Sequence, residues 1–226
     1  MKSRTELAHV AKAAALSDAA MTAAIAAMRR GGTEREVATA AHNAMYSRGG
    51  SPPGFPPLIR PLWMLEREHV SWSDRRIAEG DGLFIELSGC HARYHAPLSR
   101  TVFAGSAPPD AATNKARAET AWEAARAAIR PGAVTGDVYA AWRKAAGPDG
   151  FRHHCGYLVG IGFPPSWVGG ARVLGVAENG TTRIMERMVF HLMSWTSRHV
   201  VSDTVTVLAD GAERLTDASR ELVAVS

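Results

Sequence analysis

The sequence predicts an α+β fold in which a curved antiparallel sheet with pseudo-two-fold symmetry is covered by two helix pairs. Two observations support this prediction. Each half of the chain begins with apolar residues at helical spacing and continues with strand-like runs. The second half also repeats the first, since Ala23–Arg29 resembles Ala124–Arg130 and Gly31 corresponds to Gly132, 101 positions later. Such a duplication indicates two similar units that share one sheet.

The first half reads as a helix, a second helix and a set of strands. Leu7–Met28 carries apolar residues at three-, four- and seven-residue steps, and Gly31-Gly32 ends this helix. Thr33 and Glu36 then have the spacing of a capping box, which begins a second helix that runs to about Tyr46. The strand-like runs of this half are Leu58–Leu65, Val70–Trp72, Leu83–His91 and Thr101–Ala104.

The second half follows the same order. A helix pair is expected over about Asp110–Ile129 and Thr135–Ala146. The strands expected after it are Gly156–Ile161, Met188–Trp195 and Val200–Leu208. Because both halves contribute strands to one sheet, side chains from both should converge on a central cleft, and the functional site is expected there.

Composition and charge narrow the range of functions. The length of 226 residues suits one domain with a substantial core, and we expect a single domain over residues 1–226. The net charge is +4, but no basic stripe is interleaved with aromatic residues, which argues against a nucleic-acid partner. The N-terminus, Met1–Glu6, has no apolar core region after a basic start, so no signal peptide is expected. The longest weakly apolar run, Ala11–Met28, contains Lys12 and Asp18 and is too polar for a membrane span. We therefore expect a reduced, cytoplasmic protein with no membrane partner.

The segment Ile85–Phe103 contains the largest number of candidate catalytic or metal-binding side chains. It reads as a strand hairpin that holds a glutamate, a cysteine and two histidines. Glu86 lies between apolar residues, so its carboxylate is expected to be buried, and burial raises the pKa of a carboxyl group. Such a group suits general acid or base catalysis or nucleophilic attack. A structural carboxylate bonded to backbone amides is the alternative.

This hairpin resembles the first metal-binding segment of the pita-bread peptidases, the family of methionine aminopeptidase and aminopeptidase P. In those enzymes an aspartate stands where this chain has Glu86, and a second follows eleven residues later, where this chain has Pro97. The five metal-ligand positions of the family fall on Glu86, Pro97, Tyr157, Met193 and Ser202. Only Glu86 is a good ligand for a hard divalent ion, so the resemblance implies no catalytic metal and no cofactor. Spacing leaves open one other ligand set: His69, His91 and His95.

The chain more closely resembles the metal-independent branch of that family, which contains creatinase and ectoine hydrolase. Three further segments carry this resemblance: Glu68–Trp72, Cys155–Trp167 and Met188–Met193. It covers nearly the whole chain and implies the pita-bread fold, a small-molecule substrate and a homodimer. Creatinase and ectoine hydrolase carry an additional N-terminal domain, which this chain is expected to lack.

The same resemblance implies four catalytic residues: Glu86, His69, Tyr157 and His191. Glu86 would attack the substrate carbon or activate water to attack it. His69 matches the histidine that acts as acid or base in the creatinase branch, and imidazole titrates in the range this role needs. Tyr157 replaces a metal-binding histidine, and it would hold the developing charge together with His191. The alternative for His69, Tyr157 and His191 is a hydrogen-bonded place in the core.

Five more residues are candidates for substrate binding: His95, Arg60, Arg100, Trp72 and Trp195. A planar guanidinium matches the geometry of a carboxylate, which suggests Arg60 or Arg100, and His95 is a further option. An ion pair with Asp203 is the structural alternative for Arg100. Aromatic walls from tryptophans would suit a planar cation such as an amidinium.

Together these residues predict a metal-independent enzyme that acts on a C–N bond of a small polar amidine- or guanidine-like molecule, as in the ring opening catalysed by ectoine hydrolase. Two alternatives stay open. The same site could close a ring, eliminate or dehydrate a biosynthetic intermediate, or the domain could be a non-catalytic binding module. Convergence of the four catalytic candidates on one cleft would favour an enzyme, and divergence would favour the binding module.

Overall fold

The computed structural model describes residues 1–148, 152–168, 173–196 and 198–225. The first half contains α1 (Arg4–Ala27), α2 (Glu34–Tyr46), β1 (Leu58–Pro61), the 3₁₀ helix η1 (Leu62–Met64), β2 (Gly82–His91) and β3 (Tyr94–Ala104). The second half contains α3 (Ala111–Ala128), α4 (Thr135–Ala146), β4 (His154–Leu158), β5 (Gly175–Ala177), β6 (Val189–Trp195), β7 (Val200–Val207), β8 (Ala212–Arg214) and β9 (Val223–Val225). Both halves therefore begin with a helix pair that strands follow.

One sheet joins the two halves. Its strands lie in the order β1-β2-β3-β7-β6-β4-β5, and each strand is antiparallel to its neighbours. β8 pairs with β7, and β9 runs parallel to β3. The halves meet where β3 pairs with β7, at Ser99 opposite Ser202. We call this junction the seam.

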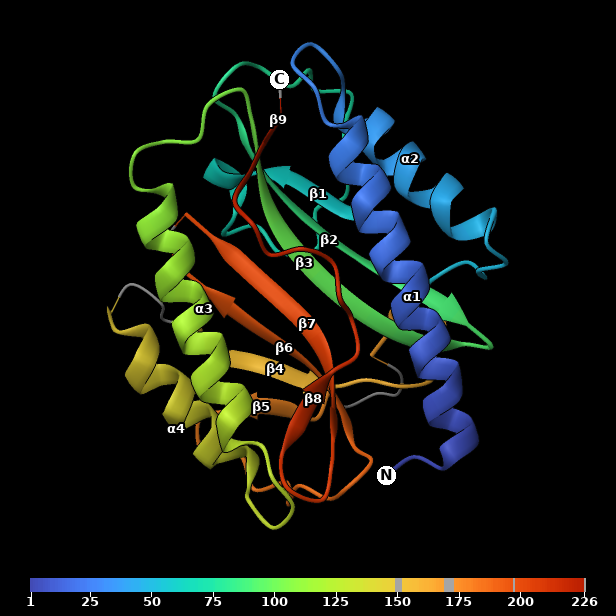
Figure 1. The fold of residues 1–226 in the computed structure, drawn as a ribbon, viewed down its shortest axis with the longest axis vertical. Coiled ribbons are helices and arrows are strands. Elements are labelled where there is room, and N and C mark those ends of the chain that lie inside the picture. Colours follow the sequence, from blue (N-terminus) through green and yellow to red (C-terminus); the bar gives the residue numbers. More distant parts are fainter. Residues whose placement is uncertain (149–151, 169–172, 197, 226) are drawn as a thin grey trace.

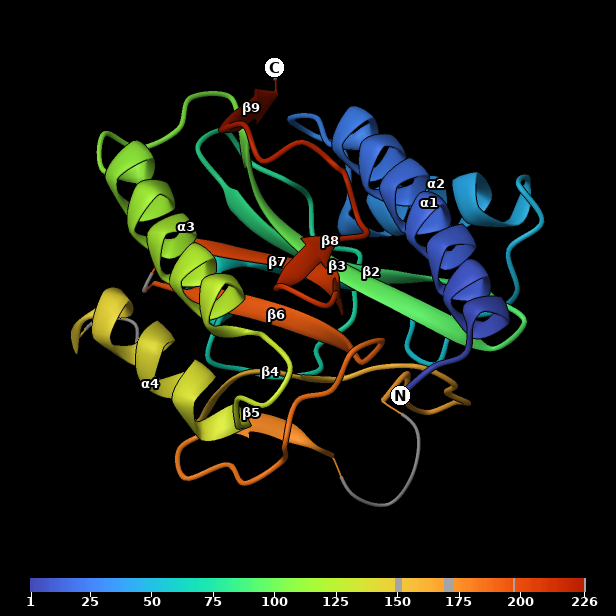
Figure 2. The same cartoon turned by 60° about the horizontal axis from the view of Figure 1, so that its bottom comes forward.

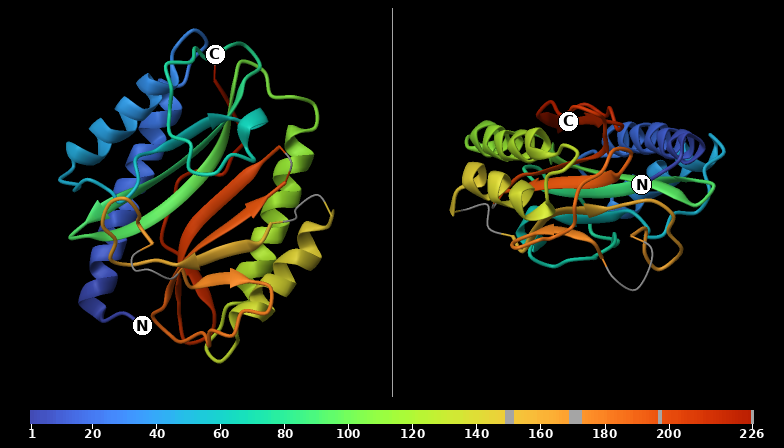
Figure 3. Two further views of the ribbon diagram at one scale, coloured as in Figure 1. Left: turned by 180° about the vertical axis from the view of Figure 1, so that it is seen from behind. Right: turned by 90° about the horizontal axis from the view of Figure 1, so that it is seen from below.

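The helices cover a single face of the sheet. Figures 1 and 2 show the pair α1 and α2 over one half of the sheet and the pair α3 and α4 over the other. Figure 3 shows helices and sheet as two layers and, from behind, the opposite face of the sheet, over which connecting loops run. This arrangement is the α+β architecture expected from the sequence, with a helix pair for each half.

By length and composition alone, helix α1 is apolar enough to cross a membrane, contrary to the expectation drawn from Lys12 and Asp18. In the structure its apolar side is covered by protein, since Val10, Ala13, Met21 and Ala24 are fully buried. The main chain of α1 lies directly on β2, because a Cβ atom built on Gly89 would be 2.3 Å from the carbonyl oxygen of Ala13. Burial of this kind is typical of a core helix.

The helix starts agree with the capping signals in the sequence. The expected capping box at α2 is confirmed: Thr33 Oγ1 accepts a hydrogen bond from the Glu36 amide (3.2 Å), and the Glu36 carboxylate accepts one from the Thr33 amide (2.7 Å). Ser3 and Glu6 form a second capping box at the start of α1. Both boxes satisfy amide donors that a helix N-terminus leaves unpaired.

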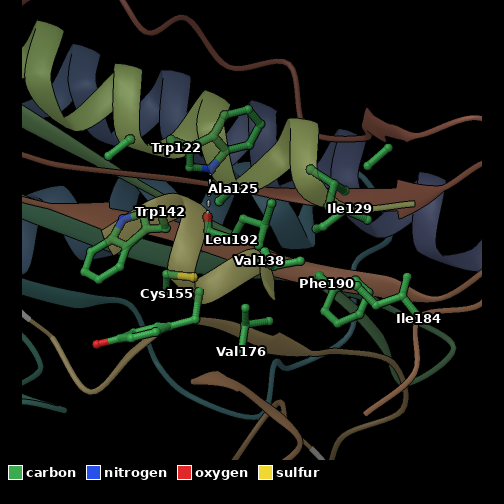
Figure 4. Close-up of a cluster of buried hydrophobic side chains, with 14 of the residues drawn as sticks. Trp122, Ala125, Ile129, Val138, Trp142, Cys155, Val176, Ile184, Phe190 and Leu192 are labelled. Carbon is green, nitrogen blue, oxygen red and sulfur yellow. Dashed lines mark hydrogen bonds between the residues drawn. The ribbon is translucent and has the colours of Figure 1, made fainter. Parts of the chain in front are cut away.

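The second helix pair packs on β6 and β7 through a core that contains two tryptophans (Figure 4). Trp122 and Trp142 are both fully buried. The Trp122 indole donates to the carbonyl oxygen of Leu192 (3.0 Å), and the Trp142 indole donates to Ser194 Oγ (3.1 Å). Because a buried indole N–H needs a partner, these bonds fix α3 and α4 to β6. β6 is the strand that carries His191.

The structure departs from the predicted elements mainly between β1 and β2. Leu58–Leu65 is not one strand, because β1 ends at Pro61 and η1 follows. Proline has no amide proton for a strand ladder, which explains the early end. Val70–Trp72 forms no strand and lies in the connection to β2. Elsewhere the expected helices and strands are present, and most ends differ by a few residues. However, β3 begins at Tyr94, seven residues before the expected Thr101, and the short strands β5, β8 and β9 were not expected.

Candidate active site

A cleft lies on the face of the sheet that the helices leave uncovered, and it has two parts. The outer chamber has a volume of about 470 Å³. The inner recess, about 60 Å³, continues from it. Six residues line both parts: Leu58, Glu68, His69, Glu86, His154 and Tyr157. Four others line the inner recess alone: Arg60, Arg152, Met193 and Trp195.

A larger surface hollow of about 800 Å³ lies over α4. Its described lining includes Asp137, Arg143, Lys144 and Glu178, and none of the residues predicted for the site. We therefore place the candidate site in the smaller cleft, where the predicted residues converge.

Strand register places Glu86 in the cleft. β2 pairs Glu86 with Leu58 of β1 and with Ser99 of β3. Side chains alternate along a strand, and Ile85 and Leu87 pack in the core beneath α1 and α2, so the Glu86 carboxylate points to the other face. Only 8 % of Glu86 is exposed. The burial predicted from its apolar neighbours is confirmed.

Burial also changes the acidity of this carboxyl group. Desolvation raises the pKa of Glu86 to about 7, and the positive charges of Arg60 and Arg152 only partly oppose this rise. The negative charge of Glu68 acts in the same direction as burial. Near neutral pH, Glu86 therefore exists in both protonated and ionised forms, as a general acid or base needs.

A continuous chain of hydrogen bonds crosses the sheet beside Glu86. The Trp167 indole donates to Tyr157 Oη (3.0 Å), and Tyr157 Oη lies 2.9 Å from His191 Nδ1. His191 Nε2 lies 2.6 Å from Ser202 Oγ, which donates to Ser99 Oγ across the seam (2.8 Å). All five side chains are buried. We call these five residues the polar chain.

The polar chain is uncharged at neutral pH. Burial lowers the pKa of His191 to about 3, and burial together with the nearby Glu86 carboxylate raises the pKa of Tyr157 well above its usual value. Because Ser202 donates to Ser99, its oxygen accepts the proton on His191 Nε2, and His191 Nδ1 then accepts the Tyr157 hydroxyl proton. Both imidazole nitrogens are occupied, so His191 acts on the cleft only through Tyr157.

The residues at the five metal-ligand positions do not fit a divalent ion. Glu86 is the only carboxylate among them, Pro97 has no side-chain donor, and Met193 offers a thioether, which suits soft ions rather than hard ones. The oxygens of Tyr157 and Ser202 are protonated and belong to the polar chain. Within the described residues, no group of three or more His, Cys, Asp or Glu side chains could hold a metal ion.

The alternative set of three histidines does not converge either. His91 Nδ1 lies 3.0 Å from His9 Nδ1, at the tip of the β2–β3 hairpin. His95 is completely buried, and its Nε2 accepts a hydrogen bond from the Gly54 amide (2.9 Å). Of the three, only His69 lines the cleft.

His69 lies on the rim of the cleft and not on a strand. Its φ angle is 57°, a left-handed conformation that is uncommon for a residue with a side chain. The imidazole stacks on Phe55 with a ring separation of 5.2 Å and is exposed to solvent. The structure therefore brings His69 to the same cleft as Glu86, in contact with water.

Two of the expected substrate-binding residues, Arg60 and Trp195, line the inner recess. The other three lie elsewhere. Arg100 pairs with Ile85 and so faces the helices, where it forms the alternative ion pair with Asp203 (3.0 Å). Trp72 packs against the first-half core, edge-on to His42 (5.8 Å between ring centres). His95 is held by Gly54 as described above. None of these three reaches either part of the cleft.

The sequence reasoning missed three polar residues of the inner recess: Glu68, Arg152 and His154. Arg152 donates to the Glu68 carboxylate (2.7 Å) across the inner recess. His154 Nδ1 is buried and has no hydrogen-bond partner among the described residues, and burial lowers the pKa of His154 to about 4. The basic run Arg152–His154, directly before the segment with Tyr157, was the available signal.

The chain is similar to several proteins that are named as peptidases or hydrolases. The model of metallopeptidase family M24 matches residues 8–207. The chain is 32 % identical over 233 residues to the uncharacterized hydrolase/peptidase y4tM of Sinorhizobium fredii, covering 99 % of this chain and 59 % of that protein. It is 30 % identical over 181 residues to ectoine hydrolase of Halomonas elongata, covering 77 % of this chain and 45 % of that protein.

A solved structure is similar over almost the whole chain. The prolidase from Pyrococcus horikoshii superimposes with a TM-score of 0.88 and 26 % sequence identity, covering 99 % of this chain and 65 % of the prolidase. The chain thus spans about half to two thirds of the length of these relatives. The pita-bread fold expected from the sequence is confirmed. The chain belongs to metallopeptidase family M24 and corresponds to its pita-bread catalytic domain.

Proposed function

We propose that this protein is a hydrolase that breaks a C–N bond of a small amidine- or guanidine-like molecule without a metal ion. The observation that carries the proposal is Glu86, a buried carboxylate in the cleft whose pKa is raised to about 7. Around it, three of the family's metal positions hold Tyr157, Met193 and Ser202, which suit proton chemistry or packing better than ion binding. The similarity to ectoine hydrolase supports a C–N substrate outside peptides.

The reaction uses one water molecule. Ionised Glu86 removes a proton from water while the water oxygen bonds to the amidine carbon, and the C=N π electrons move to nitrogen. The tetrahedral intermediate collapses when a proton reaches the leaving nitrogen: the C–N bond breaks, the C=O bond forms and the hydroxyl proton is released to solvent. The products are an amine and either an amide, from an amidine, or a urea, from a guanidine, and Glu86 passes its proton to solvent before the next cycle.

Two other residues contact the substrate in this scheme. Tyr157 Oη donates a hydrogen bond to His191 Nδ1 and accepts one from the Trp167 indole, so its remaining lone pair accepts an N–H of the amidinium and orients it. His69 meets both the cleft and the solvent, so it can deliver the proton to the leaving nitrogen and recover it from water. His191 is a positioning residue, because it acts through Tyr157.

A substrate panel tests this function. The purified protein is assayed by mass spectrometry with a cyclic amidine, an acyclic amidine, a guanidine and an Xaa-Pro dipeptide, each with a chelator or with added Mn²⁺. The proposal predicts turnover of an amidine or guanidine that the chelator does not reduce. Turnover of the dipeptide alone, dependent on Mn²⁺, contradicts it.

Turnover of the dipeptide with Mn²⁺ would instead support a second candidate function, metal-dependent hydrolysis of dipeptides. It is favoured by the family model and by the similarity to the prolidase of Pyrococcus horikoshii. The donor set of the cleft argues against it, because Glu86 is the only carboxylate at the five ligand positions. A non-catalytic binding module is less well supported, since Glu86, Tyr157 and His69 line one cleft.

Four further expectations from the sequence stay predictions: a single domain, a homodimer, a cytoplasmic location, and the lack of nucleic-acid or membrane partners. The dimer is the simplest to measure. Size-exclusion chromatography with light scattering should give twice the mass of the chain, which is 24.2 kDa.

A further inference from the structure

Cationic side chains gather in a hollow that is separate from the cleft. This hollow, of about 470 Å³, lies where α1, the end of α2 and the end of β2 meet. We call it the basic hollow, and it is lined by Lys12, Ala15, Leu16, Arg48, Gly49 and His91. None of these residues lines either part of the cleft. A molecule bound in the basic hollow is therefore not the substrate that meets Glu86.

The two permanent charges of the basic hollow have no counter-charge among the described residues. Within that part of the chain, Lys12 forms no hydrogen bond or ion pair, and Arg48 donates only to the carbonyl oxygen of Ala44 (3.2 Å). The described lining of the hollow contains no carboxylate. The hollow thus presents two cations from different elements, and an anion is the ligand that would neutralise them.

The opposite end of the same helix pair neutralises its arginines. There Arg29 pairs with Glu36 (2.9 Å) and Arg35 pairs with Asp74 (2.5 Å). All four of these side chains are exposed, so exposure alone does not leave a cation unpaired on this helix pair. The lack of a described acid beside Lys12 and Arg48 is therefore a feature of the basic hollow itself.

A histidine adds a directed hydrogen-bond donor to these charges. His91 Nδ1 lies 3.0 Å from His9 Nδ1, and the His9 ring lies nearly parallel to that of Tyr94 (5.5 Å between ring centres). Desolvation, Lys12 and His9 lower the pKa of His91, so its imidazole is neutral near pH 7. When His91 Nδ1 accepts a hydrogen bond from His9, His91 Nε2 carries the proton and can donate to a ligand. An anion in the hollow favours this tautomer.

Shape and charge restrict the ligand to a compact anion. The volume of about 470 Å³ is within the range of small-molecule sites, and Ala15 and Leu16 give the hollow an apolar part. A nucleic acid would need an extended basic stripe, which this sequence does not contain. A phosphomonoester carries close to two negative charges near neutral pH, which match Lys12 and Arg48, whereas a carboxylate carries one.

We propose that the basic hollow binds a phosphate group, as inorganic phosphate or as part of a small phosphomonoester whose body rests on Ala15 and Leu16. Lys12 and Arg48 contact the phosphate oxygens as cations, and His91 donates to them from Nε2. The site goes beyond the proposed function and does not depend on it, because its residues take no part in the cleft. Its ligand is a second molecule that the protein recognises besides its substrate.

Methyl NMR tests the site in the unmodified protein. Phenyl phosphate, inorganic phosphate and phenol are titrated, each to about 10 mM, into protein labelled with ¹³C at its alanine methyl groups, at constant ionic strength. The reporter is the methyl resonance of Ala15, assigned with Ala15→Ser. The methyl group of Ala140, which lines the hollow over α4, is the internal control.

The proposal predicts a saturable shift of the Ala15 resonance with phenyl phosphate, inorganic phosphate or both, and none with phenol. The tighter of the two phosphates shows whether the ligand is the free ion or an ester. The Ala140 resonance should not move. If neither phosphate gives a saturable shift of Ala15, or if phenol binds equally well, the proposal is overturned.

Variants connect the binding to the two cations. Lys12→Met and Arg48→Met should each weaken phosphate binding about threefold to tenfold, and the double variant more, because each change removes one charge from beside the anion. Both side chains are exposed, so the fold should tolerate their loss. Lys144→Met is the matched control, since this exposed lysine of α4 lies outside the basic hollow and should not affect binding.

The site and the proposed function fail separately. Phosphate binding by the double variant at wild-type strength overturns the site, whatever the protein hydrolyses. Glu86→Gln should bind phosphate as the wild type does, because Glu86 lies in the cleft. Loss of phosphate binding in Glu86→Gln would place the anion in the cleft and also overturn the proposal.

Discussion

The two faces of the sheet at the seam each bury a carboxylate, and they treat it in opposite ways. Asp203 is completely buried on the helix face and accepts hydrogen bonds from Arg100 (3.0 Å), Arg220 (2.6 Å) and Thr216 (2.8 Å). Burial alone would raise the pKa of Asp203, but the arginines outweigh it and hold this pKa below its usual value. Asp203 is therefore a permanent anion with a structural role.

Glu86, on the cleft face, is also buried, but within the described part of the chain no hydrogen bond from an arginine or a hydroxyl group reaches its carboxylate. The neutral His191 lies with Nδ1 3.9 Å from Glu86 Oε1, and desolvation raises the pKa of Glu86 to about 7. Burial is common to both carboxylates, so the neighbours decide whether a carboxylate stabilises the fold or exchanges protons. On the helix face the ion-paired Asp203 stabilises the fold, and on the cleft face Glu86 can exchange protons near neutral pH.

The largest expected effect is on activity, from Glu86→Gln. Loss of the general base should lower kcat about 10²- to 10⁴-fold, while the free energy of unfolding stays the same or rises. Steady-state kinetics on the substrate found in the panel and urea denaturation measure the two quantities. Glu123→Gln, an exposed glutamate outside the cleft, is the control and should keep full activity. Full turnover by Glu86→Gln would remove Glu86 from the mechanism.

The opposite result is expected for Asp203→Asn. This change leaves the buried Arg100 without its counter-charge and should lower the free energy of unfolding by about 3–5 kcal/mol, with activity per folded molecule retained. Urea denaturation followed by circular dichroism measures the loss. The control is Asp110→Asn, which breaks an exposed pair with Arg198 (3.6 Å) and should cost less than about 1 kcal/mol. An equal effect of both variants would contradict the contrast between the two faces.

The two carboxylates also predict opposite pH dependences of stability. The pKa of Glu86 is raised in the folded state, from 4.5 to about 7, so the stability that protonated Glu86 contributes is complete below pH 4.5 and is lost as the pH rises through 7. Between pH 4.5 and pH 7, the free energy of unfolding of the wild type should therefore fall by up to about 3 kcal/mol relative to that of Glu86→Gln. Asp203, with a lowered pKa, contributes stability above its ordinary pKa of 3.8 and loses it on acidification. If the difference in free energy of unfolding between wild type and Glu86→Gln does not change with pH, the raised pKa of Glu86 is contradicted.

A smaller effect is expected from Tyr157→Phe, which cuts the polar chain. Trp167 Nε1 and His191 Nδ1 lose their partner, which should lower the free energy of unfolding by about 2 kcal/mol. Activity should fall by about tenfold, mainly through KM, if Tyr157 orients the substrate. Chemical denaturation and kinetics measure both effects. Tyr46→Phe, at an exposed position on α2, should be neutral.

Much of the fold was predictable because local signals decide it. Helical spacing indicated α1 to α4, Gly31-Gly32 predicted the end of α1, and the Thr33–Glu36 capping box predicted the start of α2. The repeat of helix pair and strands predicted two halves around one sheet. The burial of Glu86 was predicted from its apolar neighbours, because a strand buried on both faces must also bury its polar residue. These inferences need no knowledge of which strands pair.

The errors arise where strand register and long-range contacts decide the outcome. The β2–β3 hairpin turns at Ala92 and Arg93, with φ angles of 49° and 69°, although turns of this type usually contain asparagine and glycine. The position of the turn was therefore not evident from the sequence. Because the turn sets the register of β2 and β3, it was also not evident that Arg100 faces away from Glu86. The polar chain likewise depends on Ser99 meeting Ser202, which no local pattern indicates.

Tyr157 and Ser202 of the neutral polar chain stand at positions that correspond to metal ligands in the pita-bread peptidases, so we expect that Glu86 holds no metal ion. Calorimetric titration of metal-stripped protein with Mn²⁺, Co²⁺ and Zn²⁺, compared with Glu86→Gln, tests it without a substrate. We expect no stoichiometric binding that depends on Glu86. One or two ions bound per chain in wild type, and lost in Glu86→Gln, would contradict the account.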